Sequence, residues 1–78
     1  KKETVVVSCR QAEELHNLLL RSGFATHIER KEYEIFLSLH EQYKAEDINE
    51  FAFKNGIILN KIVSYKKSLE SQFLELVK

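Results

Sequence analysis

Two isolated glycines and the absence of proline constrain this chain most. Gly23 and Gly56 each follow a stretch of apolar residues at helical spacing, and glycine is the usual residue at the left-handed position that ends a helix. No proline, repeat or low-complexity stretch divides the remaining sequence. The 78 residues are therefore expected to form one compact domain, near the size at which a single hydrophobic core just outweighs chain entropy.

The segment before Gly23 predicts a strand followed by a helix. Residues 4–9, TVVVSC, form a short β-branched run typical of a strand. Ser8 and Gln11 then have the S-x-x-Q spacing of a capping box, which predicts a helix start. The apolar stripe of this helix is Ala12, Leu15, Leu18 and Leu19. With Gly23 after the helix, a contact between Leu19 and Phe24 is expected.

The segment from residue 24 to residue 65 predicts a hairpin, a helix and a strand. FATHIERKEYEIFLSLHEQY indicates two strands joined by a charged turn near Arg30 to Glu32. The second strand alternates, with Ile35, Leu37 and Leu39 on one face. KAEDINEFAFKNG predicts a helix with an uncertain start and with Ala45, Ile48, Phe51 and Ala52 inward. IILNKIVSY, residues 57–65, predicts a fourth strand that is apolar on both faces at its beginning.

The C-terminal residues predict an additional helix. If Ser68 caps it, four apolar residues fall at i, i+4, i+7 and i+8 and form one stripe, with Leu74 outside it. The stripe is Leu69, Phe73, Leu76 and Val77. Burying three large apolar side chains contributes roughly 1.5 to 3 kcal/mol each, so this helix is expected to pack against the domain's own sheet or helices.

The order of elements predicts an α+β fold of the ferredoxin-like, split β-α-β class (βαββαβ) with an additional C-terminal helix, spanning residues 1–78 as a single domain. Both crossover helices should cover the same face of the sheet. The other face should carry Val6, His27, Phe36 and Tyr65. It stays uncovered unless the C-terminal helix or a partner lies on it.

The composition excludes several classes of protein. Lys plus Arg and Asp plus Glu balance at 12 each, so no overall charge attracts nucleic acid or an anionic membrane. The single cysteine, Cys9, cannot form an internal disulfide, which favours a reducing, cytoplasmic setting. The sequence has no apolar run near the roughly 18 residues that a membrane span needs. It also lacks methionine, which indicates a piece excised from a longer polypeptide.

No catalytic, cofactor-binding or metal-binding site is predicted. Neither glycine belongs to a phosphate-binding loop, and the three histidines, His16, His27 and His40, lack short metal-ligand spacing. Cys9 has no histidine near it in sequence to activate it as a nucleophile. The acidic pairs Glu13–Glu14 and Glu46–Asp47 are explained by the positive ends of the two helix dipoles.

Nucleic acid is not an expected partner. A split β-α-β sheet can bind RNA through aromatic side chains on its open face, but its third strand then needs a basic residue, glycine and aromatic residues at set positions. YEIFLSLH lacks that order, and Glu29, Glu32 and Glu34 add negative charge.

The C-terminal segment resembles the end of ABC-transporter ATP-binding subunits, which commonly finish with Ser-Leu-Glu-x-x-Phe-Leu-x-Leu. The matching residues are Ser68, Leu69, Glu70, Phe73, Leu74 and Leu76, whereas Lys67 stands where proline is frequent. AEELHNLLLRSGF and DINEFAFKNGIILNKIV resemble the upstream parts of the accessory segment in such subunits. The chain looks most similar to the drug- and bacitracin-export type.

The resemblance implies a non-catalytic C-terminal accessory domain that acts through contacts. ATP and magnesium would bind the preceding catalytic core, which is absent here. The implied partners are the ATPase core of the same polypeptide, a second copy in a homodimer and, indirectly, the membrane permease. The implied location is the cytoplasm, peripheral to the inner face of the cell membrane through the transporter complex.

Three apolar residues are candidates for such contacts. Leu20, Phe53 and Leu74 lie about 140° around their helices from the inward stripes and should be partly exposed. The alternative function is a ferredoxin-like small-molecule-sensing regulatory domain, with its ligand on the open sheet face. Against it, the loop SCRQAEE has no glycine for close ligand approach. Converging polar groups around a pocket on that face would favour the ligand, whereas a flat apolar surface would favour protein contacts.

Overall fold

The computed structural model describes residues 3–65 of the chain, which form four strands and two helices in the predicted order. The expected C-terminal helix lies outside the described residues. The elements are β1 (Thr4–Ser8), α1 (Ala12–Ser22), β2 (Ala25–Lys31), β3 (Glu34–Leu39), α2 (Ala45–Lys54) and β4 (Lys61–Tyr65).

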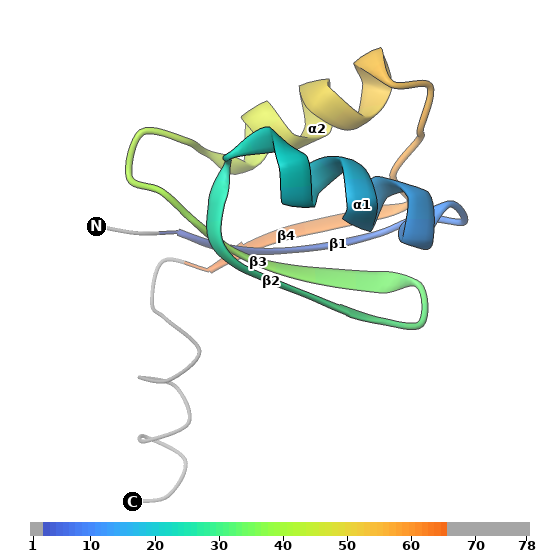
Figure 1. Cartoon of the computed structure of the whole chain (residues 1–78), viewed down its shortest axis with the longest axis horizontal. Helices are drawn as coiled ribbons and strands as arrows, with labels where there is room; N and C mark the ends of the chain where they lie inside the picture. The colour runs from blue at the N-terminus through green and yellow to red at the C-terminus, as the bar shows by residue number, and fades with distance from the viewer. Residues whose placement is uncertain (1–2, 66–78) are drawn as a thin grey trace, which may run out of the picture.

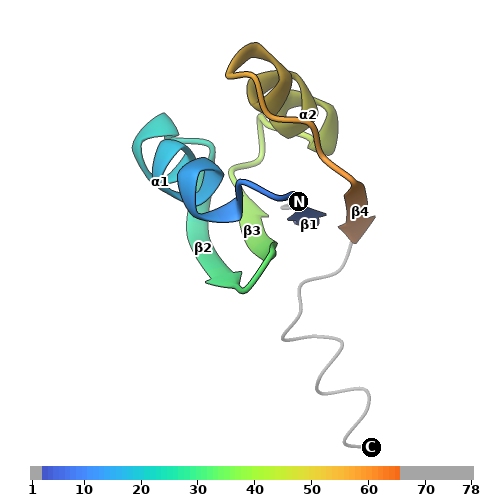
Figure 2. The same cartoon turned by 90° about the vertical axis from the view of Figure 1, so that its right-hand side faces the viewer.

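The strands form one antiparallel sheet in the order β2-β3-β1-β4. Helix α1 connects β1 to β2 across β3, and α2 connects β3 to β4 across β1, so each crossover spans one intervening strand. Both helices cover the same face of the sheet (Figures 1 and 2). The predicted α+β arrangement, βαββαβ with split β-α-β connections, is therefore confirmed.

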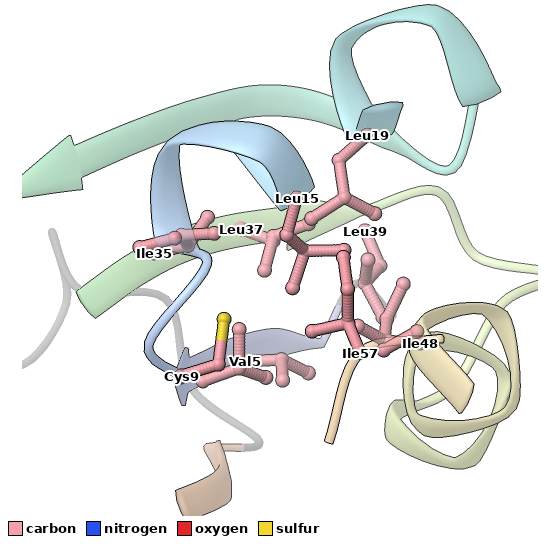
Figure 3. Close-up of a cluster of buried hydrophobic side chains, with 12 residues drawn as sticks. Val5, Cys9, Leu15, Leu19, Ile35, Leu37, Leu39, Ile48 and Ile57 are labelled. Atoms are coloured by element: carbon pink, nitrogen blue, oxygen red, sulfur yellow. The ribbon is translucent and has the colours of Figure 1, made fainter. Parts of the chain in front are cut away.

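The hydrophobic core lies between the sheet and the two helices (Figure 3). The expected alternation is confirmed, because Ile35, Leu37 and Leu39 of β3 all point inward and are at most 1% exposed. The rest of the buried cluster comes from the other elements and the connections between them: Val5, Val7, Cys9, Ala12, Leu15, Leu19, Ile48, Ala52 and Ile57. Leu18, from the predicted stripe of α1, is partly buried against this cluster.

The predicted capping box at the start of α1 is wrong. Ser8 is the last residue of β1, and its hydroxyl hydrogen-bonds to the Asn60 side chain rather than to the helix. Its backbone oxygen also accepts a hydrogen bond from the Asn60 amide, at 2.9 Å. Gln11 occupies the N-cap position without a side-chain hydrogen bond. The hydrogen bond of Ser8 to the distant Asn60 thus replaces the expected local cap. Glu13 and Glu14 do lie in the first turn of α1, as expected.

Both glycines end helices as predicted. Gly23 has φ 83° directly after α1, and Gly56 has φ 76° after α2, the left-handed conformation that glycine adopts without a steric penalty. After α2, the Ile57 amide donates to the Ala52 carbonyl (2.8 Å) and the Gly56 amide donates to the Phe53 carbonyl (3.0 Å). This pair of bonds is a Schellman motif, and it directs Ile57 back into the core.

The start of α2 is fixed by two carboxylates. The backbone amide of Lys44 donates to Asp47 Oδ2 at 2.8 Å, and that of Ala45 donates to Glu3 Oε1 at 3.1 Å. Glu3 lies 42 positions earlier in the chain, just before β1. The helix boundary that the local sequence left uncertain is therefore set partly from another element.

The β2–β3 turn lies later than predicted. The turn residues are Glu32 and Tyr33, because the strands remain paired up to Lys31 and Glu34. Pairing of Ile28 with Leu37 places both on the core-facing side. The same register continues to the pair of Lys31 with Glu34, so the strands stay hydrogen-bonded up to the turn. Glu32 adopts a positive φ of 57° at the tip.

The predicted fourth strand, residues 57–65, is too long at its beginning. Only Lys61–Tyr65 form β4. Ile57 is 1% exposed in the core, whereas Ile58 is 68% exposed. Because the chain is still leaving the left-handed turn at Gly56, it reaches β1 only at Asn60, whose amide donates to the Ser8 carbonyl.

Candidate functional site

The face of the sheet opposite the helices is the candidate site, and we call it the open face. Directly paired residues of neighbouring strands point to the same side of a sheet. The register gives three rows across β2, β3, β1 and β4. They are Lys31, Glu34, Ser8 and Lys61; then Glu29, Phe36, Val6 and Val63; then His27, Ser38, Thr4 and Tyr65. The open-face positions predicted from alternation are confirmed.

The middle row holds the apolar part of the open face. Val6 on β1 lies between Phe36 of β3 and Val63 of β4 and is 5% exposed. Phe36 is half-buried, and Val63 is 36% exposed at the edge strand. The three side chains form a short apolar strip. No described helix lies on this side of the sheet (Figure 2).

One end of the open face is closed by an ion pair. Lys61 Nζ on β4 hydrogen-bonds to Glu34 Oε2 on β3, across the intervening strand β1. Both side chains are partly exposed, so the pair contributes at most about 1 kcal/mol. Its effect is to position both charges beside the apolar strip.

A hollow of about 350 Å³ lies over β2 and β3 on the open face. The side chains around it include Thr4, His27, Glu29, Phe36 and Ser38. His27 Nε2 lies 3.4 Å from Glu29 Oε2, and both side chains are mostly exposed. The hollow thus combines an aromatic side chain with hydroxyl, imidazole and carboxylate groups. It can accept an apolar group, and its volume is at the lower end for small-molecule sites.

The histidines do not converge. His16 lies in α1, His27 in β2 and His40 after β3. Within residues 3–65, no group of three or more His, Cys, Asp or Glu side chains could hold a metal ion.

Cys9 is confirmed as a buried residue at the end of the first strand. Its side chain is fully buried, and its backbone amide donates to the Tyr33 carbonyl at 3.2 Å. Burial raises the pKa of the Cys9 thiol above its ordinary value, the nearby Glu14 charge raises it further, and a hydrogen bond from the Gln11 backbone opposes both. The thiol is therefore neutral and inaccessible at pH 7, which is the opposite of an activated nucleophile.

The predicted exposure of the helix-borne residues is confirmed for the two that the structure describes. Leu20 is 57% exposed near the end of α1, and Phe53 is 69% exposed near the end of α2. The two helices run in opposite directions (Figure 1), so these side chains lie at opposite ends of the helical layer and do not form one patch. Leu74 lies outside the described residues, as does the whole tail motif: Ser68, Leu69, Glu70, Phe73, Leu74 and Leu76.

The sequence reasoning missed the contacts that order one end of the open face. Asn60 pairs with Ser8 through both side chain and backbone, and Lys61 pairs with Glu34. The available signal was an Asn-Lys pair interrupting the apolar run of residues 57–63.

No helix in the described part of the chain is long and apolar enough to cross a membrane. Comparison with known proteins gives no match to a protein family, to a curated protein or to a solved structure.

Proposed function

We propose that this chain is a non-catalytic interaction and regulatory domain, of the ferredoxin-like class, at the C-terminus of an ABC-transporter ATP-binding subunit. Two features support the proposal: the resemblance of the tail motif to such subunits, and the exposed apolar side chains of the helical layer. Its partners are the ATPase core of the same polypeptide or a second subunit, and indirectly the permease. ATP and magnesium bind the core, at the cytoplasmic face of the membrane.

The exposure of Phe53 and Leu20 is the observation that carries the contact model. Each side chain leaves more than half of its surface in water, although the helix that bears it buries its opposite side in the core. Covering such a side chain removes apolar surface from water, at roughly 25 cal/mol per Å². Single exposed apolar residues are common on soluble proteins, so a test needs variants matched for position and charge.

The first step of the test is to determine the coding sequence upstream of Lys1. A nucleotide-binding core with a phosphate loop there supports the proposal, and any other kind of domain overturns it. The second step measures binding of the 1–78 chain to that core by calorimetry.

Matched variants identify the contact residues. Phe53→Glu and Leu20→Glu are expected to weaken binding to the core by at least tenfold. The controls are Asn49→Glu and Asn17→Glu, which place the same charge at exposed positions of the same helices. Equal affinities for all four variants would show that the helical layer does not contact the core.

The hollow on the open face favours the small-molecule-sensing alternative. Its aromatic and polar lining matches the arrangement expected for a ligand rather than a flat contact surface. The test is an NMR titration of the 1–78 chain with a small amphipathic probe such as anilinonaphthalene sulfonate. Saturable amide shifts confined to residues near His27 and Phe36 would support the alternative, and shifts spread over the whole chain would argue against it.

A further inference from the structure

The open face is the one large surface of the described sheet that no described element covers. Its opposite face is filled by α1 and α2, whereas the open face presents Phe36, Val6 and the half-exposed Val63 beside a hollow of about 350 Å³. An apolar strip with an adjoining hollow is a typical docking site for the apolar side of a helix.

The path of the chain leads directly to this face. β4 is an edge strand whose last residue, Tyr65, belongs to the open face and pairs with Thr4. Only Lys66 and Lys67 separate Tyr65 from Ser68. Two extended residues span about 7 Å, so the segment that follows begins beside the sheet. With so short a connector, the adjacent open face is nearer to it than the outer side of the two helices.

Residues 68–77 fit this surface in pattern and in length. As a helix they carry Leu69, Phe73 and Leu76 on one stripe. Ten helical residues span about 15 Å. Four strands are about 14 Å wide, and a five-residue strand is about 17 Å long, so a helix of this length crosses the sheet from edge to edge or spans most of the length of a strand.

We propose that residues 68–77 dock as a helix on the open face of the same chain. The stripe of Leu69, Phe73 and Leu76 covers the apolar strip, and the Phe73 ring occupies the hollow between Thr4, Phe36 and Ser38. Leu74 points away from the sheet. The tail motif then stabilises the domain by covering the open face, and the helical layer with Leu20 and Phe53 remains free for partners.

This inference does not depend on the proposed function. It concerns a contact within residues 1–78, whereas the proposed function concerns contacts of the helical layer with other proteins. It does bear on the ligand alternative, because a docked Phe73 fills the hollow that a small molecule would enter.

The experiment compares the full chain with a chain truncated after Lys67, by NMR and by urea unfolding. In the full chain we expect nuclear Overhauser contacts between the Phe73 ring and the side chains of Thr4 and Phe36, which line the hollow. Truncation should shift amides of the open face, and not those around Leu20 and Phe53, and should lower the unfolding midpoint. Shifts centred on the helical layer, or no shifts at all, would overturn the proposal.

Two matched pairs of variants test the contact from both sides. Phe73→Ser should lower the midpoint as much as truncation, whereas Leu74→Ser should leave it unchanged. Val63→Thr and Ile62→Thr alter neighbouring β4 residues of similar exposure, 36% and 39%, that point to opposite faces. Only Val63→Thr should weaken the contacts between the stripe and the apolar strip, because Val63 belongs to that strip. An equal response within either pair would contradict the docking.

A second copy is the main competing occupant. A mixture of ¹³C-labelled and unlabelled chains distinguishes a second copy from docking within one chain. Contacts of Phe73 that appear only between chains, together with a dimer in sedimentation, would show an exchanged tail. That result would overturn docking within one chain. If a variant fails to fold, the contacts in the unaltered chain decide the question alone.

Discussion

Ile57 and Ile58 are identical neighbours whose replacement should have very different costs. Ile57 is 1% exposed and points into the buried cluster near Ile48 and Leu15 (Figure 3), whereas Ile58 is 68% exposed. Ile57→Ala removes an ethyl and a methyl group, about 2.4 kcal/mol at roughly 0.8 kcal/mol per buried carbon. The cavity left behind adds to this cost, which gives about 2 to 5 kcal/mol in total.

The cost is large compared with the stability of the whole domain. A chain of this length is expected to have a free energy of unfolding of about 4 to 12 kcal/mol. With a urea slope near 1 kcal/mol per molar, Ile57→Ala should lower the unfolding midpoint by roughly 2 M or more. Ile58→Ala should change the free energy of unfolding by no more than about 0.5 kcal/mol.

The assay is urea unfolding followed by far-ultraviolet circular dichroism, because the chain has no tryptophan. Both variants should keep the slope of the unaltered chain, so that the midpoints report stability directly. Equal losses for the two variants, or a larger loss for Ile58→Ala, would refute the placement of residue 57 in the core and with it the shortened β4.

The remaining predictions concern Cys9, the exposed helix residues and nucleotide. The folded Cys9 thiol has a raised pKa, so the unfolded state loses its proton first, at a pKa of roughly 8.5. As pH rises above that value, the unaltered chain should lose stability relative to Cys9→Val, and parallel pH profiles would contradict this. Leu20→Glu and Phe53→Glu should each change the free energy of unfolding by under about 1 kcal/mol in chemical denaturation, since both sites are exposed, and a larger loss would show that they pack. Titration calorimetry of the 1–78 chain with Mg-ATP should show no saturable binding, because no phosphate-binding loop is present in its sequence; micromolar binding would reopen an enzymatic function.

The parts of the fold that the sequence predicted are those decided within a few neighbouring residues. Alternation in Ile35, Leu37 and Leu39 identifies a strand with one buried face, because side chains along a strand point alternately to its two sides. Gly23 and Gly56 mark helix ends, because the left-handed conformation there costs glycine little. These local signals were enough to give the order of elements and the open-face positions of Val6, His27, Phe36 and Tyr65.

Local signals could not predict which of two possible hydrogen-bond partners a polar side chain would have in the folded chain. Ser8 can cap a helix by the spacing to Gln11, but the sheet brings Asn60 to its hydroxyl, and the cap is lost. Ile57 and Ile58 look equivalent in sequence, and only the bonds that close α2 turn one inward and the other outward.

Local sequence patterns set the order of the strands and helices, most of the residues that they bury and the lack of a phosphate-binding loop. Tertiary structure alone decided the helix start at Ala12, the Glu3 contact at the start of α2 and the ion pair between Lys61 and Glu34. The physical reason is range. Periodicity and backbone preference act between adjacent residues, whereas these contacts join groups 27 to 52 positions apart, or exclude one local partner in favour of a distant one.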